Sequence, residues 1–291
     1  RTAIGRLLIA NRGEIAVRIA RTAREMGIET VAVYSEDDYA SGHLRCADIN
    51  YPLDGRGPGA YLDSEQIVAV ARQYHCEAVH PGYGFLSENS AFARLCQEAD
   101  LLFIGPAADT IALLGDKTRA RELASSCGVA INSGSSGPAS LADATAYFAS
   151  LGAGEAMVIK AITGGGGKGM RVVRSADEIA PAYQRCQSEA ERSFGNGALY
   201  VERLIQRARH VEVQIIGDGE QVSHLWEREC TLQRQHQKLL EIAPSPSLSS
   251  AQREHILDAA VRMAAATGYA NVGTFEFLVD LDREDVESGI L

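Results

Sequence analysis

The chain of 291 residues lacks several features that would assign it to a broad class of protein. Its six cysteines form no C-x-x-C motif and no close pair, so neither a zinc site nor a disulfide framework is indicated. Its apolar runs, such as LLIA and LLFI, are far shorter than the ~20 residues that span a membrane. The chain has fewer basic than acidic residues, 28 Lys and Arg against 38 Asp and Glu. Its net charge of −10 does not favour binding of nucleic acid, which is itself negatively charged. We therefore expect a soluble protein of the cytoplasm, or of the mitochondrial matrix in a eukaryote, without membrane or nucleic-acid partners.

The most unusual stretch is VIKAITGGGGKGMRVV, residues 158–173, in which four consecutive glycines precede Lys168 and Gly169. A P-loop requires a hydroxyl residue after its lysine, and glycine stands there instead. Gly164, Gly166 and Gly169 satisfy the dinucleotide pattern G-x-G-x-x-G, but that pattern has meaning only between a strand and a helix. The residues that follow, MRVVRS, are typical of a strand. The stretch therefore predicts a hairpin and neither of the two standard phosphate loops.

Strand and helix patterns alternate through the first hundred residues. The segment RLLIA (6–10) predicts a strand, and a helix follows from about 14 to 26 with apolar residues at helical spacing. Asp63 and Gln66 form a capping-box pattern at the start of the next helix. Further strands are predicted at ETVAVYS, EAVH and LLFIG. This order predicts an α/β, Rossmann-like domain over residues 1–115, with a mostly parallel sheet covered by helices.

A second domain, of α+β type, is predicted over residues 116–291, with a lid subdomain at about 132–203. Its first predicted elements are helices at about 117–127 and 140–151 and strands at 156–161 and 171–174. A long helix follows, which Ser175 and Glu178 open as a capping box, and then the strand ALYVERLI. The remaining elements are two strands from His210 onward, the irregular segment LQRQHQKLLEIAPSPSLS, a helix at 249–267 and the strand NVGTFEFLVD.

Lys160 lies in the strand MVIKA, just before the glycines. Its neighbours Ile159 and Ala161 face the other side of that strand, so Lys160 projects beneath the glycine loop, where it can meet a phosphate as a point charge. Glycines let the backbone approach a ligand closely. A flexible flap over an anionic ligand explains the pattern, and a mobile surface hairpin is the alternative.

Two later strands carry polar residues on one face. In RHVEVQII, His210, Glu212 and Gln214 alternate with apolar residues, which is typical of a half-buried strand with a solvated polar face. In TFEFLVD, Glu276 stands between two aromatic residues. A carboxylate there requires a partner, either a metal ion or a basic residue in a structural salt bridge.

A dense group of charges occupies ERECTLQRQHQKLLE. Its members are Arg228, Arg234, His236 and Lys238 with Glu227, Glu229 and Glu241. The group predicts a site for small anions, or alternatively a solvated charged loop.

Seven segments together resemble one family, the biotin carboxylase component of biotin-dependent carboxylases, within the ATP-grasp superfamily. They are LLIANRGEIAVRI, HPGYGFLSEN, GDK, VIKA with the glycine loop and GMRVV, ERLI with RHVEVQI, RECTLQRQHQK and GTFEFLVD. They follow the family's order and spacing, and the resemblance extends over the whole chain. The resemblance implies a pre-ATP-grasp domain followed by an ATP-grasp domain, with the glycine loop as a lid flap that closes over ATP and excludes water.

The resemblance also implies roles for single residues. Lys117 and Lys160 would contact the nucleotide phosphates. Glu276 would ligate Mg²⁺ or Mn²⁺, and Lys238 would face bicarbonate as the catalytic residue. The other ATP-binding residues implied are Gly164, Gly165, Gly166, Gly167, Lys168, Gly169 and Met170 in and after the flap, Glu202 and Leu204 at the adenine through the backbone with Arg203 between them, and His210, Gln233 and His236 beside the ribose and phosphates.

The implied enzyme is a ligase that transfers phosphate from ATP to bicarbonate, giving carboxyphosphate, and then carboxylates biotin on a carrier domain. Its implied partners are bicarbonate, the biotin carboxyl carrier domain and a carboxyltransferase. The chain ends at DREDVESGIL, before the family's second metal carboxylate, its bicarbonate-binding arginine, its proposed base and much of the family's dimer interface. We therefore expect a C-terminally truncated, N-terminal portion with weak magnesium affinity and little or no full turnover.

Other interpretations are another bicarbonate-using ATP-grasp ligase of the carbamoyl-phosphate synthase type, a nonenzymatic or incomplete ATP-binding module, and a dinucleotide-dependent oxidoreductase. HPGYGFLSEN and QRQHQK favour the biotin branch. The hairpin context of the glycines argues against the oxidoreductase.

Overall fold

The computed structural model describes residues 4–162, 169–234, 237–283 and 289–290. The chain divides into two compact units, residues 1–112 and 113–291, and each is described by itself. Helix α4 (Ala108–Gly115) lies at the boundary. Among the described residues, no helix combines the length and the apolar character that crossing a bilayer requires.

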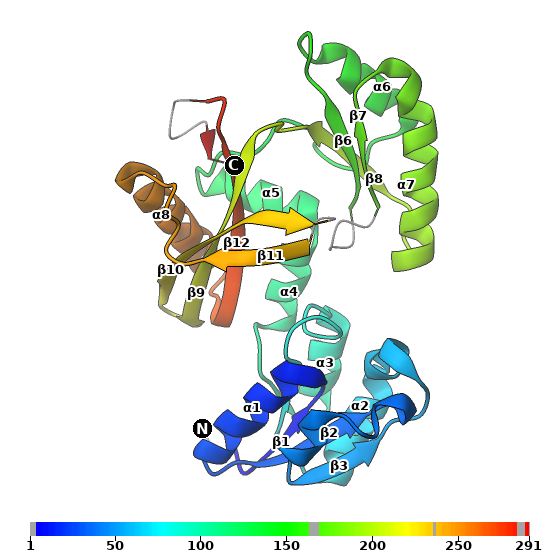
Figure 1. Cartoon of the computed structure of the whole chain (residues 1–291), viewed down its shortest axis with the longest axis vertical. Helices are drawn as coiled ribbons and strands as arrows, with labels where there is room; N and C mark the ends of the chain where they lie inside the picture. The colour runs from blue at the N-terminus through cyan, green and yellow to red at the C-terminus, as the bar shows by residue number, and fades with distance from the viewer. Residues whose placement is uncertain (1–3, 163–168, 235–236, 284–288, 291) are drawn as a thin grey trace. The chain divides into compact units, whose positions relative to one another are not determined.

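The first unit is built on a five-stranded parallel sheet in the order β3-β2-β1-β4-β5 (Figure 1). Its elements are β1 (Arg6–Ile9), α1 (Gly13–Glu25), β2 (Glu29–Tyr34), the 3-10 helices η1 (Glu36–Asp38) and η2 (Gly42–Arg45), β3 (Ile49–Pro52), η3 (Gly57–Leu62), α2 (Ser64–Gln73), β4 (Ala78–His80), α3 (Ser90–Glu98) and β5 (Leu102–Phe103). The predicted parallel α/β sheet is confirmed. Strand β3, a short edge strand that ends in proline, was not predicted.

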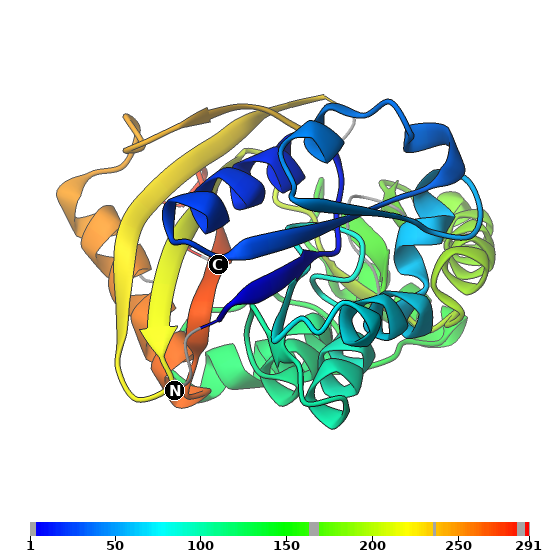
Figure 2. The same cartoon turned by 90° about the horizontal axis from the view of Figure 1, so that it is seen from below.

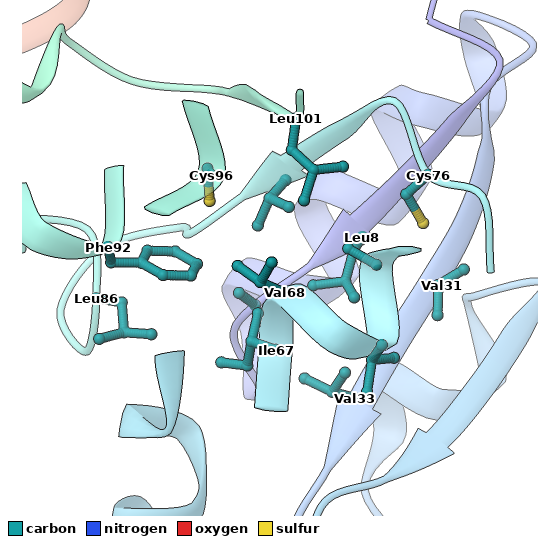
Figure 3. Packing of buried hydrophobic residues seen from close by; sticks show 14 of the residues in the cluster. Leu8, Val31, Val33, Ile67, Val68, Cys76, Leu86, Phe92, Cys96 and Leu101 are labelled. Carbon is teal, nitrogen blue, oxygen red and sulfur yellow. The ribbon is translucent and has the colours of Figure 1, made fainter. Parts of the chain in front are cut away.

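Helices cover both faces of this sheet, with α1 on one side and α2 and α3 on the other (Figure 2). Both faces of β1 are therefore apolar, as expected of a buried parallel strand. Leu8 packs with Val31, Ile67 and Phe92 (Figure 3), while Leu7 turns towards α1. Each fully buried side chain of this size stabilises the fold by about 1.5–3 kcal/mol.

The cap of α2 forms only in part as predicted. Asp63 accepts a hydrogen bond from the Gln66 N–H at 2.9 Å and so caps the helix. The Gln66 side chain does not return this bond, because it accepts one from the Asp54 N–H at 2.8 Å. Gln66 thereby ties the start of α2 to the loop after β3.

The second unit contains two antiparallel sheets, the smaller of which we call the lid sheet. The lid sheet has the order β7-β6-β8. The elements up to its last strand are α5 (Lys117–Ser126), α6 (Leu141–Ser150), β6 (Met157–Ala161), β7 (Met170–Val173), η4 (Ala176–Glu178), α7 (Ile179–Phe194) and β8 (Leu199–Arg203). Helices α6 and α7 bury one face of the sheet, and β7 forms an edge, as the predicted hairpin requires.

The larger sheet has the order β11-β10-β9-β12 and packs one face against α8 (Figure 1). Its elements are β9 (Ala208–Asp218), β10 (Val222–Arg234), β11 (Gln237–Ile242), α8 (Ser250–Ala266) and β12 (Ala270–Asp280). Val211, Val213 and Ile215 of β9 and Phe277 of β12 are buried towards α8.

Two local predictions were wrong. Residues 237–242 were expected to be irregular, but they form β11, an edge strand whose residues are all exposed. Ser175 was expected to cap α7, but its side chain makes no cap bond, and the helix begins at Ile179 after the 3-10 turn η4. Glu178 instead accepts a hydrogen bond from the Arg174 N–H at 2.7 Å.

Candidate functional site

Lys160 lies on the face of the lid sheet that α6 and α7 leave uncovered. Its neighbours Ile159 and Ala161 are buried in the core beneath those helices, and strand alternation turns Lys160 the other way. Its register partners are Met170 on β7 and Tyr200 on β8. This is the orientation that the sequence pattern predicts for Lys160.

Two basic residues contact one carboxylate on this face, that of Glu202, and a third lies beside them. The Lys160 Nζ atom donates to Glu202 Oε1, and Arg121 Nη1 lies 3.9 Å from Glu202 Oε2. Lys117, one turn before Arg121 on α5, donates from Nζ to the Ala161 carbonyl at 3.1 Å. Glu202 itself is buried, with 7% of its surface exposed. The fold thus gathers the two lysines expected at the phosphates around a single acidic residue.

Charge and burial act against each other in this group. Burial, together with the like charge of Lys160, lowers the pKa of Lys117, whereas Glu202 opposes that shift. Burial raises the pKa of Tyr200, and the neighbouring Glu202 carboxylate adds to the effect. Glu202 therefore offsets part of the repulsion between two lysines that lie close together.

Arg203 and Leu204 follow Glu202 at the end of β8, and their backbone donors are already used. The Arg203 N–H bonds to the Ser133 carbonyl at 2.9 Å, and the Leu204 N–H bonds to the Ala156 carbonyl at 2.8 Å. The Arg203 guanidinium lies 3.1 Å from a carboxylate oxygen of Asp280 at the end of β12. A backbone contact from Leu204 to an adenine would therefore use its carbonyl group.

Gly169 ends the glycine loop, and Met170 begins the strand β7. Gly169 has a φ of +65°, and an added Cβ would lie 3.0 Å from the Ala161 Cβ, so glycine suits this turn. The remaining loop residues of interest, Gly164, Gly165, Gly166, Gly167 and Lys168, lie outside the described residues, as does His236.

A second polar group lies on the face of the larger sheet opposite α8. Glu276 of β12 is in register with Glu212 of β9, and Lys238 of β11 reaches both. Lys238 Nζ donates to Glu212 and lies 2.7 Å from Glu276 Oε1. His210 Nε2 is 3.6 Å from Glu276 Oε2, and the Gln233 amide is 3.0 Å from His210 Nδ1. Four residues proposed from the sequence, at positions 210, 233, 238 and 276, are thus neighbours.

Mutual pairing shifts the pKa values of this group. His210 and Lys238 lower the pKa of Glu276 to about 2, against the opposing effect of burial. Burial works against the charge of Lys238, but Glu212 and Glu276 outweigh it and raise the pKa of that lysine. The Glu276 side chain is 54% exposed, so water screens its ion pairs and leaves the carboxylate open to a further ligand.

Glu276 fits a role in holding Mg²⁺. Magnesium prefers oxygen ligands and is commonly held by one or two carboxylates together with substrate phosphates. Glu276 presents such a carboxylate at the surface of the sheet. Glu212, Cys230 and Glu241 also place ligand atoms within 4.8 Å of one another. Because the Glu212 carboxylate already bonds to Arg228 and Lys238, its oxygen atoms are less available as metal ligands.

The charged segment around β10 is divided between the two faces of the sheet, so only part of it lies beside Lys238, and the predicted small-anion site stays a prediction for that part. Strand alternation sends Arg228 to the polar face beside Glu212, and Glu227 and Glu229 to the α8 side. Glu227 pairs there with Arg253, with 2.9 Å between Oε1 and Nε. The carboxylates on the α8 side therefore hold the fold together.

Glu229 is the centre of that structural group. Its carboxylate accepts hydrogen bonds from Arg209 at 2.7 Å, from Thr231 at 3.0 Å, from Ser245 at 2.7 Å and from Ser247. Burial opposes its charge, but these donors lower the pKa of Glu229 to about 2. It fastens the segment after β11 to the sheet.

Sequence reasoning missed Arg121 and the engagement of Glu212. Arg121 stands four residues after Lys117 on α5, a spacing that places both on one helix face, so helical periodicity could have found it. Glu212 was assigned to a solvated polar face, but it is 4% exposed and bonded to Arg228 and Lys238. Only the pairing of β9 with β10 and of β10 with β11 reveals this.

Two family models match consecutive parts of the chain. The biotin carboxylase N-terminal domain matches residues 3–111, and the ATP binding domain of the carbamoyl-phosphate synthase L chain matches residues 116–287. Pyruvate carboxylase of Bacillus subtilis is 50% identical over 279 residues, which is 95% of this chain and 24% of the relative. The chain thus spans about a quarter of the length of that relative.

Solved structures show the same fold. The biotin carboxylase domain dimer of Hydrogenobacter thermophilus 2-oxoglutarate carboxylase, in complex with MgADP, ADP and bicarbonate, has a TM-score of 0.94 at 40% identity, covering 100% of this chain and 64% of that one. A biotin carboxylase domain of thermophilic 2-oxoglutarate carboxylase, bound to ADP without magnesium and with a disordered phosphate tail, has a TM-score of 0.73 at 41% identity, covering 99% and 62%.

A parallel α/β unit followed by an ATP-binding unit with a lid sheet defines an enzyme fold of the ATP-grasp class. Within that class, the chain belongs to the biotin carboxylase domains of biotin-dependent carboxylases, of which it carries the N-terminal and ATP-binding domains. The family expected from the seven sequence segments is confirmed.

Proposed function

We propose that this chain binds ATP and bicarbonate for the first half-reaction of a biotin-dependent carboxylase. In that reaction, phosphate transfer to bicarbonate gives carboxyphosphate, and biotin on a carrier domain is then carboxylated. The observation that carries the proposal is that one unit contains two polar groups. Lys117 and Lys160 belong to the group at the lid sheet, and Lys238 and Glu276 belong to the group on the larger sheet.

Lys117 and Lys160 would bind the phosphates of the nucleotide. Both are partly buried, and a charge-assisted bond from a partly buried lysine is stronger than one in bulk water. Glu202 and Leu204 would meet the adenine through the backbone, with Arg203 fixed between them by Asp280. The glycine loop, residues 164–169, would close over the phosphates as a flap.

Glu276 would hold Mg²⁺, or Mn²⁺ in its place, with the phosphates as further ligands. The metal would neutralise charge on the transferred phosphoryl group. Lys238 would direct its ammonium group to bicarbonate and stabilise the negative charge of that anion. Gln233 holds the His210 ring at 3.0 Å, so that the imidazole, with His236, can contact the ribose or the phosphates.

The phosphate tail would be held firmly only with the metal present. The relative bound to ADP without magnesium has a disordered phosphate tail, and we propose the same dependence here. The partners of the reaction would be bicarbonate, a biotin carboxyl carrier domain and a carboxyltransferase, since the pyruvate carboxylase relative is about four times as long as the matched region.

The test is bicarbonate-dependent release of phosphate from ATP by the full-length protein that contains this chain. Bicarbonate should stimulate the release, and Lys238→Gln should reduce the stimulated rate by about 100-fold or more while ADP still binds. Stimulation that survives the substitution unchanged would rule out the role given to Lys238. A protein in which bicarbonate has no effect at all would contradict the proposed reaction.

A further inference from the structure

Among the described residues, Glu202 is the one whose carboxylate lies next to the basic groups proposed to bind phosphate. We propose that Glu202 makes tight binding of the nucleotide's diphosphate depend on a divalent cation, by selecting the metal complex over the free anion. The inference rests on the proposed function, because it takes Lys117 and Lys160 as phosphate ligands.

The position of Glu202 is fixed from several directions. One carboxylate oxygen accepts a bond from Lys160, and the other faces Arg121 at 3.9 Å. Arg121 is itself anchored, since it donates to the Asn132 carbonyl at 2.6 Å. On the backbone side, Gly134 packs so closely that an added Cβ would lie 3.0 Å from the Glu202 Cβ. The carboxylate cannot turn into water without giving up both basic partners.

A phosphate that binds Lys160 must therefore share that lysine with a buried carboxylate. The repulsion between Glu202 and the ligand grows with the ligand's negative charge, and burial strengthens it because water screens it less. A free diphosphate carries more negative charge than its magnesium complex. Glu202 consequently disfavours the free anion more than the complex, and the basic groups alone do not hold the phosphates tightly.

Glu202 acts on the charge of the ligand and does not coordinate the metal. Both of its oxygens already face basic groups, whereas Glu276 offers a half-exposed carboxylate for coordination. Replacing Glu202 by glutamine keeps the shape and an acceptor for Lys160 but removes the negative charge. The metal should then matter less for binding.

The lid sheet offers a matched control. Glu189 of α7 pairs with Arg171 of β7, with 2.9 Å between Oε2 and Nη2. Arg171 is in register with Ile159, which is buried beneath α6 and α7, so this pair belongs to the helix-covered face, opposite Lys160. Glu189→Gln makes the same change in charge on the helix that covers this sheet, without touching the group around Glu202.

Calorimetry of ADP binding to the wild type, Glu202→Gln and Glu189→Gln, each with Mg²⁺ and with EDTA, tests the proposal. The quantity of interest is the ratio of the two dissociation constants within each protein, since contacts made by the metal itself cancel when these ratios are compared. Metal-free ADP should bind about tenfold more tightly to Glu202→Gln and MgADP at most about twofold more tightly, so that the ratio falls at least about fivefold. Glu189→Gln should leave the ratio unchanged.

Each other outcome has a definite meaning. An equal ratio in Glu202→Gln and the wild type, or an equal loss of affinity for both forms of ADP, overturns the inference and leaves the proposed function standing. A wild type that binds neither form overturns both. Thermal melting checks that the variants fold, and Glu202→Ala, which also removes the charge, replaces the glutamine variant if that variant does not fold.

Discussion

Glu212 and Glu276 stand directly opposite each other on β9 and β12, and Lys238 bonds to both carboxylates. Like charges in register on neighbouring strands repel, and a shared cation between them removes that cost. The same lysine is the residue proposed to meet bicarbonate. Lys238 therefore has a structural task in addition to the catalytic one proposed for it.

Replacing Lys238 by methionine should destabilise the fold by about 1–3 kcal/mol, because it leaves the buried Glu212 with one basic partner fewer and in register with a second carboxylate. Urea denaturation at neutral pH measures the change. Arg94→Met, which breaks the exposed pair with Asp109, is the control and should cost at most about 0.5 kcal/mol. Equal effects of the two substitutions would contradict the tight pairing of Lys238.

Stability should fall in acid partly through Glu229. Its folded-state pKa is lowered from 4.5 to about 2, so its contribution is complete above pH 4.5 and is lost as the pH falls from there towards 2. Glu229→Gln should lower stability at neutral pH by about 1–3 kcal/mol, since Arg209 loses its partner. In this variant, the free energy of unfolding should also decrease less steeply as the pH falls between these two values. Denaturation curves at several pH values compare the slopes, and parallel slopes in wild type and variant would argue against the bonds seen at Glu229.

Gly134→Ala should weaken both the lid and nucleotide binding. An added Cβ would lie 2.4 Å from the Val201 carbonyl and 3.0 Å from the Glu202 Cβ, so β8 must shift. We expect a loss of about 1–3 kcal/mol in stability together with weaker binding of ADP. Gly137→Ala is the control, since a Cβ there meets nothing within 4 Å. Thermal melting with and without ADP measures both effects, and equal behaviour of the two variants would show that β8 is not held as described.

Strand alternation was the part of the site that the sequence could predict. It correctly turned Lys160 away from the core and placed His210 and Glu212 on one face, because a strand has a period of two residues. The pattern could not show which carboxylate Lys160 meets. That partner, Glu202, is 42 residues away in the chain and is brought near only by the register of β6 with β8.

The charged segment shows why the rest could not be predicted. The segment QKLLEI in β11 does not alternate between apolar and polar residues, because an exposed edge strand buries neither face. The sequence pattern therefore did not indicate a strand there. Strand β10 shifts register between His224 and Glu227, where Trp226 has a φ of +68°. Such a bulge changes which residues face the core, so the division of acidic residues between two faces required the paired strands themselves.

The assignment of the lid face to nucleotide phosphates is tested most directly by calorimetric binding of ADP, ATP and NAD to this chain with Mg²⁺, repeated for Lys160→Ala and for Arg171→Ala on the opposite face of the lid sheet. We predict that ADP and ATP bind, that NAD does not, and that Lys160→Ala weakens ADP binding by about 1.5–3 kcal/mol while Arg171→Ala has little effect. Binding of NAD in preference to ADP, or equal effects of the two substitutions, would contradict the assignment of the lid face to nucleotide phosphates.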